Sequence, residues 1–144
     1  MKNYIIKLFC LVFASCLLCS LSSCEKPGPY EFWQPDDQIE SIEIVNVYGK
    51  ISEPLQYDVL VTITDHESFL EKFYEIPFGK ELGSVPNRVH GPCIRVVYKN
   101  GDSEYINDFY QSRYLNGAND FYDAGQSCDQ EEFFALLTYF GYVG

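Results

Sequence analysis

The sequence has little of the chemistry on which many enzymes depend. It contains two histidines, His66 and His90, and it lacks a Gly-Xaa-Ser-Xaa-Gly elbow, a phosphate-binding loop and a dinucleotide-binding fingerprint. Neither histidine stands in a pattern that selects it as the base for a nucleophilic Cys128. Isolated histidines and separated cysteines also lack the ligand spacing of a zinc site. We therefore expect no enzymatic activity, no metal and no cofactor.

Positive charge is also scarce. The chain has 10 Lys+Arg against 21 Asp+Glu. Two of the cations, Lys2 and Lys7, precede residue 24, whereas every acidic residue follows it, so the chain from residue 24 onward has a formal charge of −13. Nucleic-acid binding depends on neutralising phosphates, and peripheral binding to anionic lipid depends on basic clusters. This charge argues against both kinds of partner.

The N-terminal segment has the organisation of an export signal. Lys2 and Lys7 precede an uncharged, largely apolar run over Leu8–Leu21. A basic start followed by an apolar stretch is typical of a secretory signal peptide. The run is shorter than the ~20 residues that a spanning helix needs, and no basic stop-transfer cluster follows it. The sequence thus predicts a chain that is exported rather than one that spans the membrane.

The end of this segment, Leu21-Ser22-Ser23-Cys24, resembles the lipobox of bacterial lipoproteins. The resemblance implies cleavage before Cys24 and a thioether-linked diacylglyceryl group on its sulfur, with acyl chains such as palmitate. Two acyl chains suffice for stable anchoring, whereas one does not. We expect a lipid-anchored, extracytoplasmic protein of the cell envelope. The alternative is an ordinary secretory signal cut nearby, with Cys24 free or disulfide-bonded.

Proline separates the anchor from the rest of the chain. Pro27, Pro29 and Pro35 disfavour both helix and sheet, and a segment stretched as polyproline reaches roughly 40 Å. We divide the chain into a signal peptide (1–23), a lipidated cysteine with a Pro-rich tether (24–38) and one domain (39–144).

Apolar periodicity in the domain predicts an α+β fold. The pattern gives one antiparallel sheet of four to five strands with two helices packed on one face, in the order ββα-ββ(β)α. The expected strands cover 39–48, 57–63, 93–99 and 102–109, with a weaker hairpin around Asn116-Gly117. The expected helices begin at capping boxes formed by Thr64 with Glu67 and by Ser127 with Gln130.

Two local features make this prediction more specific. A change of apolar phase at Ile44-Val45 predicts a bulge or burial on both sides of the first strand. A two-residue turn at Asn100-Gly101 would pair Val96 with Tyr105, and would place Arg95 and Glu104 together on a solvent-exposed face. In the weaker hairpin, a two-residue turn would pair Arg113 with Asp120.

Besides Cys24, the chain after the signal contains two cysteines, Cys93 and Cys128. Disulfides are common in exported proteins, and we predict that these two residues pair. The alternative is a pair of buried thiols.

Five residues are candidates for binding. Tyr110, Tyr114 and Tyr122 belong to an aromatic-rich stretch that would form an exposed patch, since tyrosine combines an apolar ring with a polar tip. Arg88 and His90 lie in the long connection 77–92, where loops are often functional. The alternatives are aromatic residues divided between core and surface, and a solvated loop.

The expected function is non-enzymatic binding of a protein or glycan partner in the envelope or outside the cell. An inhibitor of a cationic lytic or defence enzyme is the first alternative, because an acidic surface favours cationic partners. A hydrolase with an unrecognised carboxylate pair is the second, since an acidic chain contains many such pairs.

Overall fold

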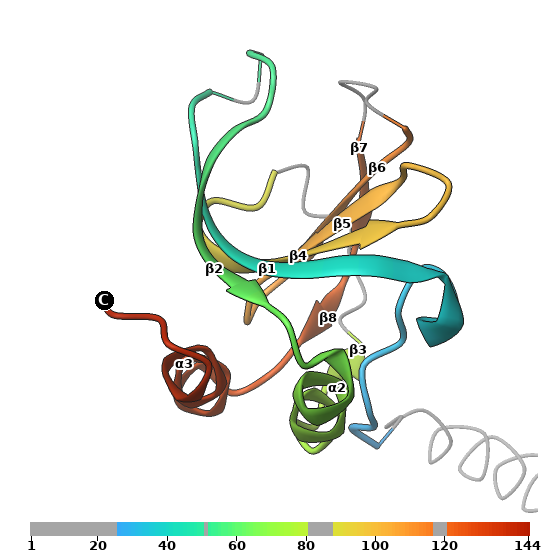
Figure 1. The fold of residues 1–144 in the computed structure, drawn as a ribbon, viewed down its shortest axis with the longest axis vertical. Coiled ribbons are helices and arrows are strands. Elements are labelled where there is room, and N and C mark those ends of the chain that lie inside the picture. Colours follow the sequence, from blue (N-terminus) through green and yellow to red (C-terminus); the bar gives the residue numbers. More distant parts are fainter. Residues whose placement is uncertain (1–25, 51, 81–87, 117–120) are drawn as a thin grey trace, which may run out of the picture.

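A computed structural model describes residues 26–50, 52–80, 88–116 and 121–144 of the chain. The predicted α+β class, with one main antiparallel sheet and two helices, is confirmed (Figure 1). The main sheet has the strand order β2-β1-β4-β5-β6-β7, and β3 pairs with β8 beside it. The elements are η1 (Asp36–Gln38), β1 (Ile39–Tyr48), β2 (Gln56–Ile63), α2 (His66–Tyr74), β3 (Gly79–Lys80), β4 (Gly91–Tyr98), β5 (Ser103–Ile106), β6 (Gln111–Tyr114), β7 (Phe121–Ala124), β8 (Gln126–Ser127) and α3 (Gln130–Tyr139).

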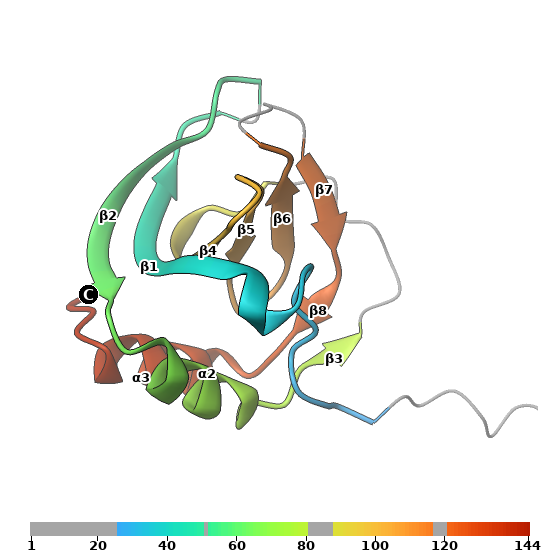
Figure 2. The ribbon, with the colours of Figure 1, turned by 45° about the vertical axis from the view of Figure 1, so that its right-hand side comes forward.

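The sheet is strongly curved (Figure 2), and each of its faces contributes side chains to a buried core. The rings of Tyr57 in β2 and Tyr105 in β5 lie 5.9 Å apart although two strands separate them. Neighbouring strands are spaced by about 4.8 Å, so this contact requires the sheet to fold toward itself. The inner face holds a strand-side core of Val45, Val47, Val89, Cys93, Tyr105 and Tyr114.

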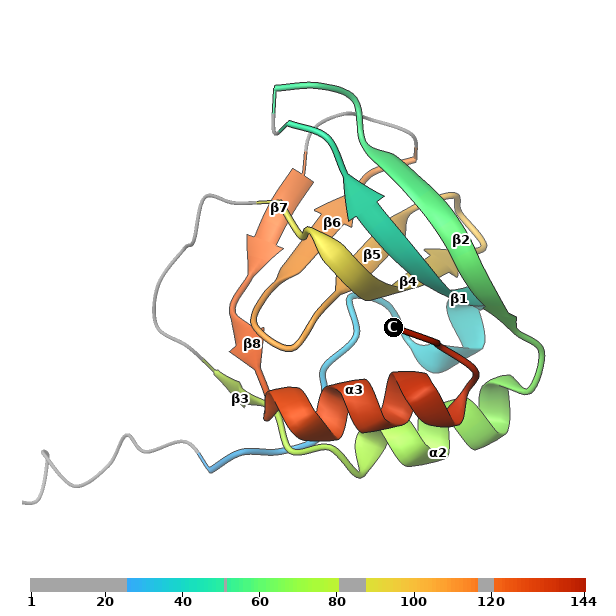
Figure 3. The same ribbon diagram turned by 90° about the vertical axis from the view of Figure 1, so that its left-hand side faces the viewer.

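The outer face carries the helices. Phe69 and Phe73 of α2 and Phe133 and Leu137 of α3 are fully buried against the sheet, in a helix-side core with residues such as Ile42. Figure 3 shows the two helices side by side beneath the strands. Both helices therefore cover one face, as the apolar stripes predicted.

Strand β1 contributes to both cores, as its apolar phase predicted. Ile44 belongs to the helix-side core and Val45 to the strand-side core, and neither is accessible to solvent. The predicted irregularity also occurs, because Ile44 pairs with Val61 whereas Val45 pairs with Val59. Leu60 is therefore the extra residue of the bulge, which lies in the edge strand β2.

The hairpin between β4 and β5 forms where it was predicted, but its predicted register is wrong by one residue. Val96 pairs with Glu104 rather than with Tyr105. The turn explains the shift. The Gly101 amide donates to the Tyr98 carbonyl (2.8 Å), and among the residues of this turn only Gly101 has a left-handed backbone, with φ of 87°. This is a type I turn followed by a glycine bulge, which adds one residue to the loop.

A shift of one residue exchanges the two faces of a strand. Glu104, expected at the surface beside Arg95, is fully buried on the helix side of the sheet. Arg95 lies across from Tyr105 on the other side. The predicted solvent-exposed charge ladder is therefore wrong.

The second hairpin is longer than predicted. Arg113 pairs with Tyr122 instead of Asp120, and Tyr114 pairs with Phe121. Residues 115–120 thus form the connection, of which 117–120 lie outside the described residues. Asn116 has a positive φ of 22° at its start.

The helices begin one or two residues later than the predicted caps. Asp65, not Thr64, caps α2, and its carboxylate accepts from the Ser68 amide at 3.0 Å. Asp129 caps α3 and accepts from the amides of Glu131 and Glu132. An aspartate carboxylate satisfies the free amides of a helix start as well as a hydroxyl does, so an aspartate one or two residues later takes this role.

Residues 28–38 lie on the domain, although the sequence analysis placed them in the tether. Tyr30 is 2% exposed and contacts Phe73 and Phe78. The amide of Gly28 donates to the Phe78 carbonyl (2.9 Å), and the Phe78 amide donates back to Gly28 (2.7 Å). The domain therefore begins at about residue 28 rather than at residue 39.

Candidate functional site

The most buried charged side chain that the structure describes is that of Glu104. One oxygen accepts from the Tyr30 hydroxyl (2.7 Å) and from Arg113 Nε (2.7 Å). The other accepts from the Tyr98 hydroxyl (2.7 Å) and from the Trp33 amide (3.0 Å). Four donors at these distances compensate the loss of water around a buried carboxylate.

These contacts also fix the protonation of the neighbouring tyrosines. Burial raises the pKa of Tyr30 well above its ordinary value, and the nearby negative charge of Glu104 raises it further. The pKa of Tyr98 is raised by the same two causes in the same order. Both hydroxyls therefore remain protonated donors at neutral pH. Because each oxygen of Glu104 already has two donors, the cluster holds the chain together rather than offering a free acid or base.

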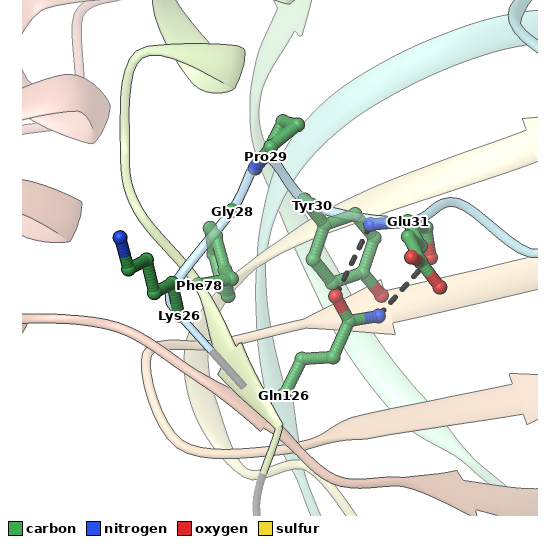
Figure 4. Close-up of a pocket in the computed structure, with 7 residues that line it drawn as sticks. All are labelled: Lys26, Gly28, Pro29, Tyr30, Glu31, Phe78 and Gln126. Carbon is green, nitrogen blue, oxygen red and sulfur yellow. Dashed lines mark hydrogen bonds between the residues drawn. The ribbon is translucent and has the colours of Figure 1, made fainter. Parts of the chain in front are cut away.

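The N-terminal segment has a second set of contacts beyond Glu104. The side-chain amide of Gln126, in β8, donates to the Glu31 carbonyl (3.1 Å) and accepts from the Glu31 backbone amide (3.1 Å) (Figure 4). It thus pairs with the Glu31 backbone as the backbone of an adjacent strand would. A cavity of about 190 Å³ lies here, lined by Lys26, Gly28, Pro29, Tyr30, Glu31, Phe78 and Gln126. Residues from both ends of the domain therefore meet at this point.

On the inner face of the sheet, Arg95 is the centre of a second polar cluster. Its Nη1 lies 2.6 Å from a carboxylate oxygen of Glu43, and its Nε donates to the Tyr105 hydroxyl (3.0 Å). The guanidinium also lies 4.9 Å from the centre of the Tyr57 ring. Paired in this way, Arg95 helps to close the strand-side core.

The structure brings three of the five predicted binding residues together, but as internal contacts. Arg88 is 2% exposed and donates to the carbonyls of Glu53 (2.9 Å) and Lys50 (2.7 Å), which holds the connection between β1 and β2. The Tyr110 hydroxyl donates to the Arg88 carbonyl (2.8 Å), and Tyr114 is buried in the strand-side core. Tyr114 is buried and Tyr110 is half-buried, so these two tyrosines do not form the predicted exposed patch.

The other two candidates do not join them. His90 is exposed on the residues leading into β4. The side chain of Tyr122 lies outside the described part of the structure. Residues 81–87 of the connection 77–92, predicted as a functional loop, also lie outside it.

The predicted disulfide is absent, and Cys93 and Cys128 are free thiols. Cys93 lies in the strand-side core, whereas Cys128 packs against the helix-side core, so the sheet separates them. Burial is the main cause that raises the pKa of both thiols, to about 12 for Cys128. Thiolates are the reactive form, so both residues are unreactive at neutral pH.

An exposed groove lies between the two helices, on the side away from the sheet. Its volume is about 380 Å³, and it is lined by Lys72, Glu75, Ile76, Glu132, Ala135, Leu136 and Tyr139. Tyr139 is 65% exposed, with the Lys72 ammonium 4.5 Å from its ring centre. The groove thus presents an exposed aromatic ring and aliphatic side chains beside two carboxylates.

Acidic residues continue beyond the groove. The exposed acidic residues of the two helices and their caps are Asp65, Glu67, Glu71 and Glu75 at α2 and Asp129, Glu131 and Glu132 at α3, and of these Glu75 and Glu132 line the groove. Residues four apart share one side of a helix, so Glu67, Glu71 and Glu75 form a stripe. The sequence contained this spacing, but the groove itself depends on the tertiary fold that brings α3 beside α2.

Within the described residues, no group of three or more His, Cys, Asp or Glu side chains is arranged to hold a metal ion. In the same part of the chain, no helix has the length and apolar character needed to cross a membrane. A comparison of the chain with protein-family models, curated proteins and solved structures found no match.

Proposed function

We propose that the chain is a lipid-anchored, extracytoplasmic binding domain without enzymatic activity, and that the groove between α2 and α3 binds a cationic macromolecule. The observation that carries this proposal is the groove itself, with the exposed ring of Tyr139 beside Glu75 and Glu132. Aromatic side chains in the centre of a contact surface often provide much of the binding energy. The anchor is proposed from the resemblance of Leu21-Ser22-Ser23-Cys24 to a lipobox.

The charge around the groove favours a cationic partner. Seven exposed acidic residues lie on the two helices and their caps, against one cation, Lys72, whose ammonium lies over the Tyr139 ring. A cationic partner with an apolar face complements both the carboxylates and the apolar floor formed by Ile76 and Leu136. An inhibitor of a cationic lytic or defence enzyme is one form that this function would take.

The hydrolase alternative has less support. Glu104, the fully buried carboxylate, already accepts four hydrogen bonds and has no free lone pair directed at a substrate. A general acid or base must lie within reach of the substrate and must exchange a proton with it during the reaction. We therefore prefer binding to hydrolysis as the proposed function.

Calorimetric titration with a synthetic amphipathic peptide, with lysines on one face and leucines on the other, tests this proposal. We expect saturable binding that weakens at high salt, because ion pairs at an exposed surface are screened. Tyr139→Ala and Glu132→Lys should each weaken binding about tenfold, which corresponds to about 1.4 kcal/mol.

Asp58→Lys in β2 is the matched control for this titration. It changes the net charge by the same amount as Glu132→Lys, but at an exposed position outside the groove. We expect it to leave the affinity nearly unchanged. Equal weakening by both lysine substitutions, or no saturable binding, would contradict a specific groove.

A further inference from the structure

The N-terminal segment is fixed to the domain much closer to the proposed anchor than the sequence suggested. Gly28 exchanges backbone hydrogen bonds with Phe78, and Tyr30 and Trp33 donate to Glu104. Three residues, Glu25, Lys26 and Pro27, are therefore all that separates Cys24 from Gly28. The linker consists of these few residues rather than the fourteen up to Gln38.

The length of this linker limits the distance from the lipid. An extended chain spans at most about 3.6 Å per residue, so the four steps from Cys24 to Gly28 reach roughly 14 Å. The free tether expected from the sequence would have reached roughly 40 Å. A folded domain on so short a linker cannot rotate freely above the membrane, because its own bulk meets the headgroups.

We infer that the covalent anchor holds this domain against the membrane surface, and that the corner formed by Gly28, β3 and β8 faces the lipid headgroups. This inference rests on the proposed lipidation of Cys24. The corner includes the exposed Lys26. A lysine near an anionic surface favours this orientation of a domain that the covalent lipid already holds in place.

The same orientation leaves the groove accessible. Helix α3 begins three residues after Ser127, the last residue of β8, and extends away from the point where the N-terminal segment leaves the domain (Figure 3). Ten helical residues extend about 15 Å. Tyr139, at the far end of α3, therefore lies farther from the lipid than the corner and is accessible to a partner from solution.

Fluorescence quenching in membranes tests this orientation. The full chain is produced with its signal and purified as the lipoprotein, and mass spectrometry verifies the diacylglyceryl group on Cys24. One fluorophore is placed at Pro77→Cys, next to Phe78 at the corner, or at Lys50→Cys, in the connection between β1 and β2. Both positions are exposed, and the parent protein measures background labelling of Cys93 and Cys128.

In phosphatidylcholine–phosphatidylglycerol vesicles that contain a headgroup-attached, short-range quencher, we expect several-fold stronger quenching at residue 77 than at residue 50. A ten-residue Gly/Ser insertion between Lys26 and Pro27 adds a root-mean-square length of roughly 17 Å. It should bring the quenching at residue 77 down toward that at residue 50, while the contacts of Gly28 and Tyr30 stay intact.

The outcomes separate this inference from the proposed anchor. If Cys24 carries no lipid, both the anchor and the orientation are overturned. If Cys24 is lipidated but residues 77 and 50 are quenched equally, or the insertion has no effect, the orientation alone is overturned. Stronger quenching at residue 50 would place the opposite end of the domain on the membrane and would also overturn it.

Discussion

The Glu104 carboxylate occupies a position where a single side chain joins several segments of the chain. It joins the N-terminal segment through Tyr30 and Trp33, and it joins β4 and β6 through Tyr98 and Arg113. Removing one partner from a buried, charged hydrogen-bonded group leaves the other partners unsatisfied. Substitutions here should therefore cost far more stability than the same changes at the surface.

Glu104→Gln should lower the free energy of unfolding by about 3 kcal/mol, because Arg113 loses its charge partner and the new amide presents donors to groups that already donate. Urea denaturation measures the effect. Glu40→Gln, at an exposed position of β1, is the control and should change stability by less than about 0.5 kcal/mol. Similar values for the two variants would mean that the Glu104 contacts contribute little.

The buried tyrosines predict the response to alkaline pH. The pKa values of Tyr30 and Tyr98 are raised above the ordinary tyrosine value of about 10, so the folded state holds these protons more tightly than the unfolded state. Their contribution to stability is therefore complete below about pH 10 and is lost as the pH rises further. We expect the urea midpoint to fall above about pH 10. Tyr30→Phe should reduce this fall, and an unchanged slope would contradict the assignment.

The two thiols give a separate prediction. Mass spectrometry of the non-reduced protein should find Cys93 and Cys128 both reduced, and maleimide should label them slowly at neutral pH unless the protein is unfolded. The raised pKa values of both thiols are the reason, since the thiolate is the reacting form. Recovery of a Cys93–Cys128 bridge from the native protein would contradict the observed arrangement.

At the scale of elements, the geometry of each turn determines the register of the hairpin that it connects. Asn100-Gly101 is a strong hairpin signal, and a hairpin forms there. The same dipeptide fits a two-residue loop or a longer one with a glycine bulge, and the choice depends on contacts outside the hairpin. Asn116, which lies beyond β6, contacts the turn: its amide donates to a carboxylate oxygen of Asp102 (3.0 Å). Local sequence therefore predicted the hairpin but not which residues face the core.

Gly101→Ala should destabilise the protein by about 1–2 kcal/mol. A side chain is strained at φ of 87°, and a Cβ atom built at Gly101 would lie 2.6 Å from Oδ1 of Asn116. Thermal unfolding measures the loss. Gly28→Ala is the matched control, since a Cβ atom there has no neighbour within 4 Å. A larger effect at Gly28 than at Gly101 would contradict the turn geometry.

For the molecule as a whole, apolar periodicity was sufficient to predict the class of fold but not the extent of the domain. The stripes of α2 and α3 and the apolar phases of β1 each depend on residues close in sequence, and these predictions were correct. The contact of Tyr30 with Glu104 joins residues 74 positions apart. The apolar Phe32 and Trp33 suggest packing on the domain edge or at the lipid interface, but their spacing does not show which residues they contact. The groove between α2 and α3 was missed for the same reason.

The boundary of the domain can be tested by truncation. A chain beginning at residue 26 should unfold cooperatively, whereas a chain beginning at residue 39 should lack this transition, because it loses Tyr30, Phe32 and the donors to Glu104. Circular dichroism with heating measures both. The double substitution Pro27→Ala/Glu31→Ala in the longer chain is a control that leaves the backbone contacts of Glu31 available. Equal stability of the two truncated chains would restore the boundary at residue 39.

The placement of the first segment has a consequence for the order of folding. Tyr30 and Glu31 find their partners at Glu104 and Gln126, so the earliest part of the domain to be synthesised completes its contacts only when nearly the whole chain is present. Contacts between distant residues form slowly because a long loop must close first. A chain that leaves the cytoplasm N-terminus first therefore cannot form these contacts of its N-terminal segment during translocation. In the proposed exported protein, the slow formation of these contacts would keep the chain unfolded, and so competent for translocation, until its last strand has crossed the membrane.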